Sequence, residues 1–186
     1  GVLTVSAGNT LTINSTSATN TRFGSGTLNI PNTATVTWAP GGSIDVVGNG
    51  TINNDGLFDI QADGNFGDQG VGIGNITFNN NAAGEIRRST GTGPAYLGSS
   101  GGGTGNYVLL SNSGLIDIQT GELGINRIFT PSGTSGSSTH FSGSSVQVAA
   151  FTTLRLGGFS GTHTFDAGSA INGAGTLIVE GGGTFD

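Results

Sequence analysis

Short alternations of apolar and polar residues recur along the whole chain, and most of them follow a glycine. The clearest unit is Gly-x-aliphatic-polar-aliphatic, and its copies begin at Gly1, Gly26, Gly56, Gly84, Gly114, Gly143 and Gly175. Successive glycines lie 25, 30, 28, 30, 29 and 32 residues apart. Alternation with a period of two is typical of β-strands. A repeat of this length is typical of stacked structural units rather than of one globular core.

Each repeat is predicted to contain three strands. A second apolar pair follows about ten residues after the glycine motif, as at Val36/Trp38, and a third follows about twenty residues after it, as at Ile44/Val46. Three strands and three turns describe one coil of a three-sided parallel β-helix, in which neighbouring coils pair at about 4.8 Å. We therefore predict an all-β fold without significant helix. We expect residues 1–186 to form a single β-solenoid domain of about seven coils, each of 25–32 residues.

Aligning the glycine motifs predicts which side chains stack inside the solenoid. One inward column contains Leu3, Leu28, Phe58, Ile86, Ile116, Val146 and Leu177, and a second contains Val5, Ile30, Ile60, Ile118, Val148 and Val179. Arg88 occupies the second column, and because a buried unpaired guanidinium is costly, we expect the strand to end or bulge there. Between the columns, Asp59, Arg87 and Asp117 are expected to face outward as a ladder of alternating charge.

Glycine- and asparagine-rich segments are expected at the corners of the coils. Asn53–Gly56 and Asn112–Gly114 are interpreted as turns, since these residue types tolerate a positive φ. Residues 89–106 and 130–145 are predicted to be loops that project from a corner. The chain starts on a glycine motif and stops part-way through a repeat. We therefore expect a solenoid that is uncapped at both ends and has pairable strand edges.

Composition narrows the classes of function. Only 9% of the residues are charged, the net charge is −6, and all five basic residues are arginines. Phosphate binding needs a dense basic patch, so no nucleic-acid partner is expected. No apolar run approaches the roughly 18 residues of a membrane span, so no membrane insertion is predicted. The chain has no cysteine, which excludes disulfides and thiolate metal sites.

Two candidate catalytic patterns lack the context that their chemistry needs. Gly98-Ser99-Ser100-Gly101-Gly102 matches the G-x-S-x-G elbow of hydrolases, and Asp117 and His140 follow in the hydrolase order, but no strand–turn–helix pattern surrounds the motif. Asp45, Asp59 and Asp117 are candidates for the paired carboxylates of a polysaccharide-cleaving β-helix. Because they are not clustered, we interpret them as outward residues on solvated faces of the coils.

Metal binding is not expected either. Asp63–Asp68 resembles a calcium-binding nonapeptide, but such sites take ligands from successive copies and this copy is single. His140 and His163 lie among Thr and Ser residues without a second ligand nearby, so we expect them at surface or turn positions. The sequence thus predicts no catalytic, cofactor-binding or metal site, and no cofactor.

The repeats resemble a known family of surface proteins. The phrases that carry the resemblance are Asn54-Asp55-Gly56-Leu57-Phe58-Asp59-Ile60, Ser113-Gly114-Leu115-Ile116-Asp117-Ile118 and Gly175-Thr176-Leu177-Ile178-Val179. They resemble the extracellular β-solenoid regions of bacterial adhesins, autotransporter passengers and filamentous-haemagglutinin-like proteins. The resemblance implies a right-handed parallel β-helix, placed outside the cell or on its surface.

The expected function is that of a non-catalytic extracellular structural protein: a stalk, a fibre or an adhesin segment. Its expected partners are further copies, stacked end to end through the solenoid edges, and surface glycans or other host or cell-surface ligands. A polysaccharide-binding or polysaccharide-cleaving β-helix is the alternative, with Trp38, Tyr96 or Tyr107 as sugar platforms, although the parity of Trp38 places it in the core. An ice-binding solenoid is a second alternative, suggested by the pairs Thr10/Thr12, Thr35/Thr37 and Thr162/Thr164.

Overall fold

The computed structural model describes residues 1–16, 20–67, 74–98, 106–125, 139–157, 162–180 and 184–185. Their regular secondary structure consists of β-strands alone, arranged in three parallel sheets. No helix within these ranges is long and apolar enough to cross a membrane. The predicted all-β class is therefore confirmed.

Strands that are three apart in the sequence are neighbours in the same sheet. In spatial order, sheet 1 contains β1 (Val2–Thr4), β4 (Thr27–Ile30), β7 (Gly50–Asn54), β10 (Gly74–Asn80), β13 (Asn106–Asn112), β16 (Thr139–Phe141), β19 (Thr162–Phe165) and β22 (Thr184–Phe185). Sheet 2 contains β2 (Thr10–Ile13), β5 (Thr35–Trp38), β8 (Leu57–Ile60), β11 (Glu85–Arg88), β14 (Leu115–Ile118), β17 (Ser145–Val148) and β20 (Ala170–Gly173). Sheet 3 contains β3 (Thr21–Phe23), β6 (Ile44–Val46), β9 (Gly64–Gly67), β12 (Pro94–Leu97), β15 (Glu122–Ile125), β18 (Thr153–Gly157) and β21 (Thr176–Glu180).

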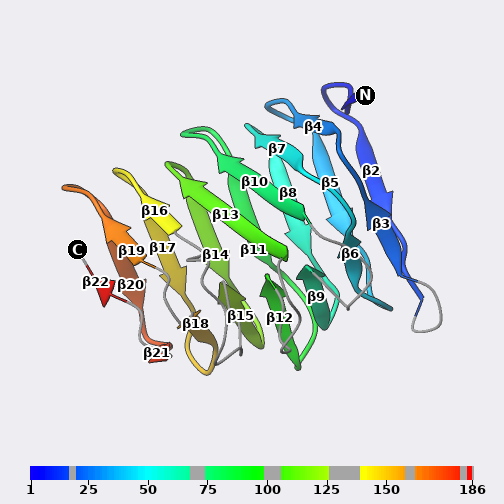
Figure 1. The fold of residues 1–186 in the computed structure, drawn as a ribbon. Helices are drawn as coiled ribbons and strands as arrows, with labels where there is room; N and C mark the ends of the chain where they lie inside the picture. Colours follow the sequence, from blue (N-terminus) through cyan, green and yellow to red (C-terminus); the bar gives the residue numbers. More distant parts are fainter. Residues whose placement is uncertain are drawn as a thin grey trace.

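The chain visits sheets 1, 2 and 3 in turn, and one passage through the three sheets is one coil of a β-solenoid. Figure 1 shows the coils stacked along one axis, with the two termini at opposite ends of the stack. The three sheets confirm the predicted three-sided solenoid. All side chains that point inward therefore share one continuous core that runs along the axis.

The coils differ in length, and this corrects part of the predicted columns. In sheet 2 the first inward column consists of Leu11, Val36, Phe58, Ile86, Ile116, Val146 and Ile171, which are unevenly spaced along the sequence. The central members Phe58 to Val146 were predicted correctly. The other predicted members lie in different sheets. Sheet 1 holds Leu3 and Leu28 with their neighbours Val5 and Ile30, and sheet 3 holds Leu177 and Val179.

The error has a physical origin in the corners of the coils. The coil from Val36 to Phe58 is the shortest in this column, so the next glycine motif falls one side further around the solenoid. The same shift occurs after Val146, where the coil to Ile171 is shorter than the two coils before it. A glycine followed by alternating residues marks a corner and the strand after it, and each of the three corners can supply one.

An aromatic cluster fills the core from the first to the fourth coil. The Phe66 ring lies 6.1 Å from Phe23, 6.3 Å from Trp38 and 6.3 Å from Phe58, and Phe58 lies 5.1 Å from Phe78, measured between ring centroids. The predicted core position of Trp38 is confirmed, and its Nε1 donates a hydrogen bond of 3.1 Å to the Gly42 carbonyl. The cluster joins residues of all three sheets.

The two segments predicted as projecting loops each contain a strand. β12 lies within residues 89–106, and β16 lies within residues 130–145. Residues 99–105 and 130–138 lie outside the described part of the chain. These two segments thus contribute regular rungs to sheets 3 and 1.

Candidate functional site

A ladder of buried asparagines runs through the interior of sheet 1. Asn54, Asn80 and Asn112 end three successive strands and face inward, where they continue the column of Ile30. Asn54 Nδ2 donates to Asn80 Oδ1 at 2.7 Å, and Asn80 Nδ2 donates to Asn112 Oδ1 at 2.6 Å. Bonds to the carbonyls of Glu85 (3.0 Å) and Leu115 (3.1 Å) tie the ladder to the first residues of β11 and β14 in sheet 2. The ladder therefore binds three coils together inside the core.

Asn54 and Asn112 were predicted to lie in turns, but both lie in strands and have buried side chains. The signal that identifies them is parity. Asn54 lies two residues after the inward Ile52, and Asn112 lies two residues after the inward Leu110. A polar residue in phase with inward apolar residues is itself directed inward.

A second asparagine ladder lies on the outer face of the same sheet. Asn53 Nδ2 donates to Asn29 Oδ1 and Asn79 Nδ2 donates to Asn53 Oδ1, both at 2.9 Å. Asn29 Nδ2 reaches Thr4 Oγ1 at 3.3 Å, which extends the ladder to the first strand. Both ladders run along the solenoid axis, so polar side chains of sheet 1 connect one coil to the next.

Arg88 is fully buried at the corner between sheets 2 and 3. It is paired in register with Ile60 and Ile118, and β11 ends at Arg88 just as β8 and β14 end at those two residues. The predicted strand end is present. The guanidinium nevertheless lies inside the core, where an unpaired charge would be costly.

Hydrogen bonds compensate the charge of Arg88. Its NH1 donates to the carbonyls of Ala62 at 2.8 Å and Ile60 at 3.3 Å, and its NH2 donates to the Gly93 carbonyl at 3.1 Å. NH2 also forms an ion pair with Asp63 Oδ1, while Asp63 Oδ2 accepts the backbone N–H of Gly93 at 3.1 Å. Asp63 had been singled out for a calcium-like motif, but its carboxylate serves as the counter-ion of Arg88.

Gly91 gives the Arg88 corner its shape. Its φ is +91°, and a Cβ there would meet the carboxylate of Asp63 and the guanidinium of Arg88. Only glycine adopts this conformation freely and leaves space for both groups. The corner therefore has a structural role, which is to hold the Arg88–Asp63 ion pair. Asp68, the last residue of the calcium-like motif, lies outside the described residues.

A charged ladder lies on the outer face of sheet 3. Arg155 Nε donates to Glu122 Oε1 at 2.6 Å, NH2 donates to Glu122 Oε2 at 3.0 Å, and NH1 donates to Glu180 Oε2 at 2.7 Å. The hydrogen bond to Glu122 raises the pKa of the Arg155 guanidinium, so the side chain stays charged. Arg155 thereby links β15, β18 and β21 along the axis.

The predicted outer ladder of sheet 2 has the expected register but a different main contact. Arg87 is paired with Asp59 on one side and Asp117 on the other. Its guanidinium nevertheless binds Glu85 of its own strand through two bonds of 2.8 Å, and Asp117 lies 4.0 Å away. Asp59 and Asp117 each accept a glutamine side chain, from Gln61 and Gln119, at 2.7 Å.

The carboxylates considered for polysaccharide cleavage are divided between two sheets. Asp45 lies on β6 of sheet 3, where it is buried and accepts a 2.9 Å bond from Asn20, whereas Asp59 and Asp117 lie on sheet 2. The structure does not bring Asp45 together with the other two. Within the described ranges, no three His, Asp or Glu side chains form a group that could hold a metal ion.

The residues considered for hydrolase, sugar-binding and ice-binding functions also do not form one site among the described residues. Of the serine motif only Gly98 is described, and the rest of it lies outside the described residues. Tyr96 is buried on β12, its hydroxyl 3.5 Å from Glu122 Oε1. Of Tyr107, only the backbone is described. The threonine pairs at 10/12 and 35/37 stack on each other in sheet 2, whereas the pair at 162/164 lies in sheet 1.

The two histidines occupy different environments. His140 is exposed, and its Nε2 lies 2.9 Å from Asp166 Oδ2. The predicted surface or turn position of His163 is wrong, because His163 is fully buried in β19 and its Nδ1 contacts Thr139 Oγ1. Burial lowers the pKa of His163, because a charged imidazolium is poorly solvated in the core.

This lowered pKa predicts a loss of stability in mild acid. The unfolded chain binds the His163 proton near the ordinary pKa of 6.5, whereas the folded chain binds it only at lower pH. The contribution of neutral His163 to the free energy of unfolding is therefore complete above pH 6.5. It declines as the pH falls toward the pKa of the folded state, by at most about 1.4 kcal/mol per pH unit. Urea unfolding between pH 7.5 and 5 should show this decline in the native chain and in His140→Gln. A decline of the same size in His163→Gln would contradict the assignment.

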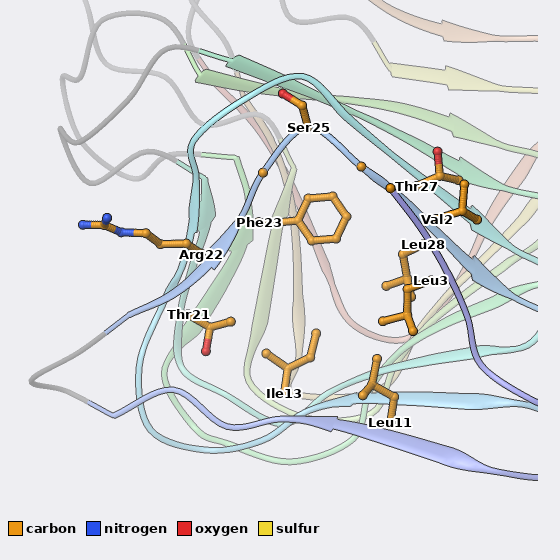
Figure 2. A pocket seen from close by; sticks show the side chains of 13 residues that line it. Val2, Leu3, Leu11, Ile13, Thr21, Arg22, Phe23, Ser25, Thr27 and Leu28 are labelled. Atoms are coloured by element: carbon orange, nitrogen blue, oxygen red, sulfur yellow. The ribbon is translucent and has the colours of Figure 1, made fainter.

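An apolar hollow opens at the end of the solenoid formed by the first coil. It has a volume of about 510 Å³ and is lined chiefly by apolar side chains of β1 to β4. Figure 2 shows Leu3, Leu11, Ile13, Phe23 and Leu28 converging on this space while Arg22 points away from it. Leu3 is 55% exposed although it belongs to an inward column.

The opposite end also presents inward columns to the solvent. Leu177 and Val179 of β21 are 44% and 45% exposed, although they continue the buried columns of Leu154 and Leu156. Among the described residues, β1 to β3 pair with strands on one side only, and so do β20 to β22. Each end is thus an apolar core section framed by three pairable strand edges, a surface that fits another β-coil.

No family model, no curated protein and no solved structure matches the chain. The β-solenoid implied by the resemblance to adhesin and autotransporter repeats is present.

Proposed function

We propose that this chain is a non-catalytic structural segment of an extracellular or cell-surface protein: a stalk, a fibre or an adhesin, in which solenoids stack end to end. The observation that carries the proposal is that polar side chains connect neighbouring coils to one another. The two asparagine ladders and the Glu122–Arg155–Glu180 ladder all form hydrogen bonds from one coil to the next along the axis. Polar groups arranged in this way strengthen a rod.

The two ends support the stacking part of the proposal. Leu3 at one end and Leu177 and Val179 at the other are about half exposed, and burying the exposed half of such a side chain contributes roughly 1 kcal/mol. Association costs about 4–15 kcal/mol in lost freedom of motion, so the few side chains of one interface favour stacking at high protein concentration. The extracellular placement rests on the resemblance of the repeats.

Electron microscopy of the purified chain over a series of concentrations tests this function. We expect rods that lengthen with concentration. Leu177→Glu should abolish them, because it places a charge at the centre of the joint, whereas Thr176→Glu, an outward neighbour, should leave them intact. Single solenoids at every concentration would contradict stacking. Release of reducing ends from polysaccharides by the same preparation would contradict the non-catalytic role.

A further inference from the structure

We infer that two copies of this chain join through their sides, with Phe151 of one copy seated in a notch beside Thr33 of the other. This contact involves the corners of the coils, so it goes beyond the proposed stacking of their ends. Two turns with unusual backbone geometry, and the lengths of the corners that contain them, point to it.

Phe151 extends into the solvent from a strained turn between β17 and β18. Its side chain is fully exposed, and its φ is +67°, which is a steric outlier for a bulky residue. The Thr152 N–H closes the turn by donating to the Ala149 carbonyl at 3.2 Å. Gly8 and Gly168, with φ of +76° and +90°, hold the corresponding position in two other turns. Phenylalanine thus stands where glycine fits without strain, and its exposed ring adds nothing to the core.

The corner that contains Phe151 is firmly held and longer than its neighbours. The Thr152 side chain is buried, and its Oγ1 donates to the Ala149 carbonyl at 2.8 Å and lies 3.3 Å from the Ile118 carbonyl oxygen. Four residues separate β17 from β18, whereas three separate β14 from β15 and two separate β20 from β21. The Phe151 ring therefore lies at the tip of a projecting corner, as an aromatic anchor of an interface does.

A notch of complementary shape lies at the corner between sheets 1 and 2. Two residues separate β7 from β8, whereas four separate β4 from β5 and four separate β10 from β11. The short corner between two longer ones coincides with a hollow of about 210 Å³. A cavity of about 150 Å³ accommodates benzene, so this hollow has room for a phenyl ring.

The lining of the notch is compatible with an aromatic ring. Ala34, Leu57 and Ala83 line it together with neutral polar residues. Glu85 is the charged residue of the lining, and Arg87 already neutralises it through an ion pair of 2.8 Å. A phenylalanine ring that enters the notch therefore meets no unpaired charge.

Thr33, which also lines the notch, shares the backbone conformation of Phe151. Its φ is +72°, and a β-branched residue with a positive φ is a steric outlier. Thr33 and Phe151 are the non-glycine residues with a positive φ in the described part of the chain. Backbone strain of this kind clusters at functional sites, so its presence at both surfaces supports a contact between them.

The contact joins different surfaces of the two copies. The notch lies in the second to fourth coils and Phe151 in the sixth, so a copy that donates its ring keeps its own notch free. A heterologous contact of this kind adds copy after copy, in a ring or an open chain, and does not close a symmetric dimer. In a fibre it joins neighbouring rods side by side.

Sedimentation equilibrium over a series of concentrations tests the contact. All samples carry Leu177→Glu, so that association through the ends does not contribute. We expect the average mass of this chain to rise with concentration. Adding Phe151→Asn should keep it monomeric without lowering its midpoint of urea unfolding, because asparagine tolerates a positive φ. Ala150→Asn, at the exposed neighbour in the same turn, is the matched control and should leave the association intact.

A variant of the notch provides the second half of the test. Ala83→Glu places a further carboxylate beside Glu85 and should also keep the chain monomeric. Ala167→Glu, at an exposed alanine in a different corner, should not. Equal amounts of Phe151→Asn and Ala83→Glu should associate when mixed, since the first keeps its notch and the second keeps its ring. The mixture should stop at twice the monomer mass, because only one contact can form.

Three results would overturn the inference. If the chain is monomeric at every concentration, Phe151 serves a partner other than a second copy. If Phe151→Asn associates as the background chain does, the ring is not part of the contact. If the two variants stay monomeric when mixed, the ring does not enter this notch. None of these results bears on stacking through the ends, which electron microscopy of the native chain tests separately.

Discussion

Replacing Asp63 with alanine is expected to lower the free energy of unfolding by roughly 3 kcal/mol, because it leaves the buried guanidinium of Arg88 without its counter-ion. Asp63 is itself 43% exposed, so its removal opens little space in the core. The loss arises mainly from the charge that stays behind. Equilibrium unfolding in urea, followed by circular dichroism, measures it once the transition has been shown to be two-state.

Two further variants separate the charge effect from lost packing. Asp117→Ala removes an outward aspartate whose nearest cation is 4.0 Å away, and it should cost less than about 1 kcal/mol. Asp63→Ala/Arg88→Met leaves no buried charge, since methionine can continue the column of Ile60 and Ile118. The double variant should therefore be more stable than Asp63→Ala alone. A double variant less stable than Asp63→Ala would show that the Arg88 charge is not the cause.

The second large effect is expected at the centre of the buried asparagine ladder. Asn80→Ala removes the bonds to Asn54 and Asn112 and leaves buried polar atoms without partners. Each such atom costs about 1–3 kcal/mol, so the total loss should be roughly 2–4 kcal/mol by the same urea measurement. Asn53→Ala is the matched control, because Asn53 is the central member of the outer ladder and water can replace its bonds. We expect it to cost less than about 1 kcal/mol, and equal losses in the two variants would contradict a special role for the buried ladder.

The sequence predicted the architecture well because strand parity and turn chemistry are local properties. Phe58, Ile86, Ile116 and Val146 were placed in one column correctly, since the coils between them differ little in length. The assignment failed at Leu28, where the following coil shortens. The length of a corner depends on how the chain packs around it, and a fixed period carries no information about that.

The buried polar groups were harder to predict for a different reason. Arg88, His163 and Asn80 are costly to bury alone, and their partners lie in other coils, 24 to 32 residues away. A single sequence does not show which distant residue compensates them. The parity of Arg88 placed it in an inward column, and the structure follows that parity.

Because the coils are unequal, the length of the solenoid depends on the number of coils and not on the number of residues. Each coil advances the axis by about 4.8 Å whatever its circumference. The coil from Val36 to Phe58 is the shortest of its column and the coil from Ile86 to Ile116 is among the longest, yet both add one rung to each sheet. Residues inserted at a corner therefore widen the rod, and only a complete additional coil lengthens it. A chain built in this way can vary its side surface freely while the distance that it spans stays fixed.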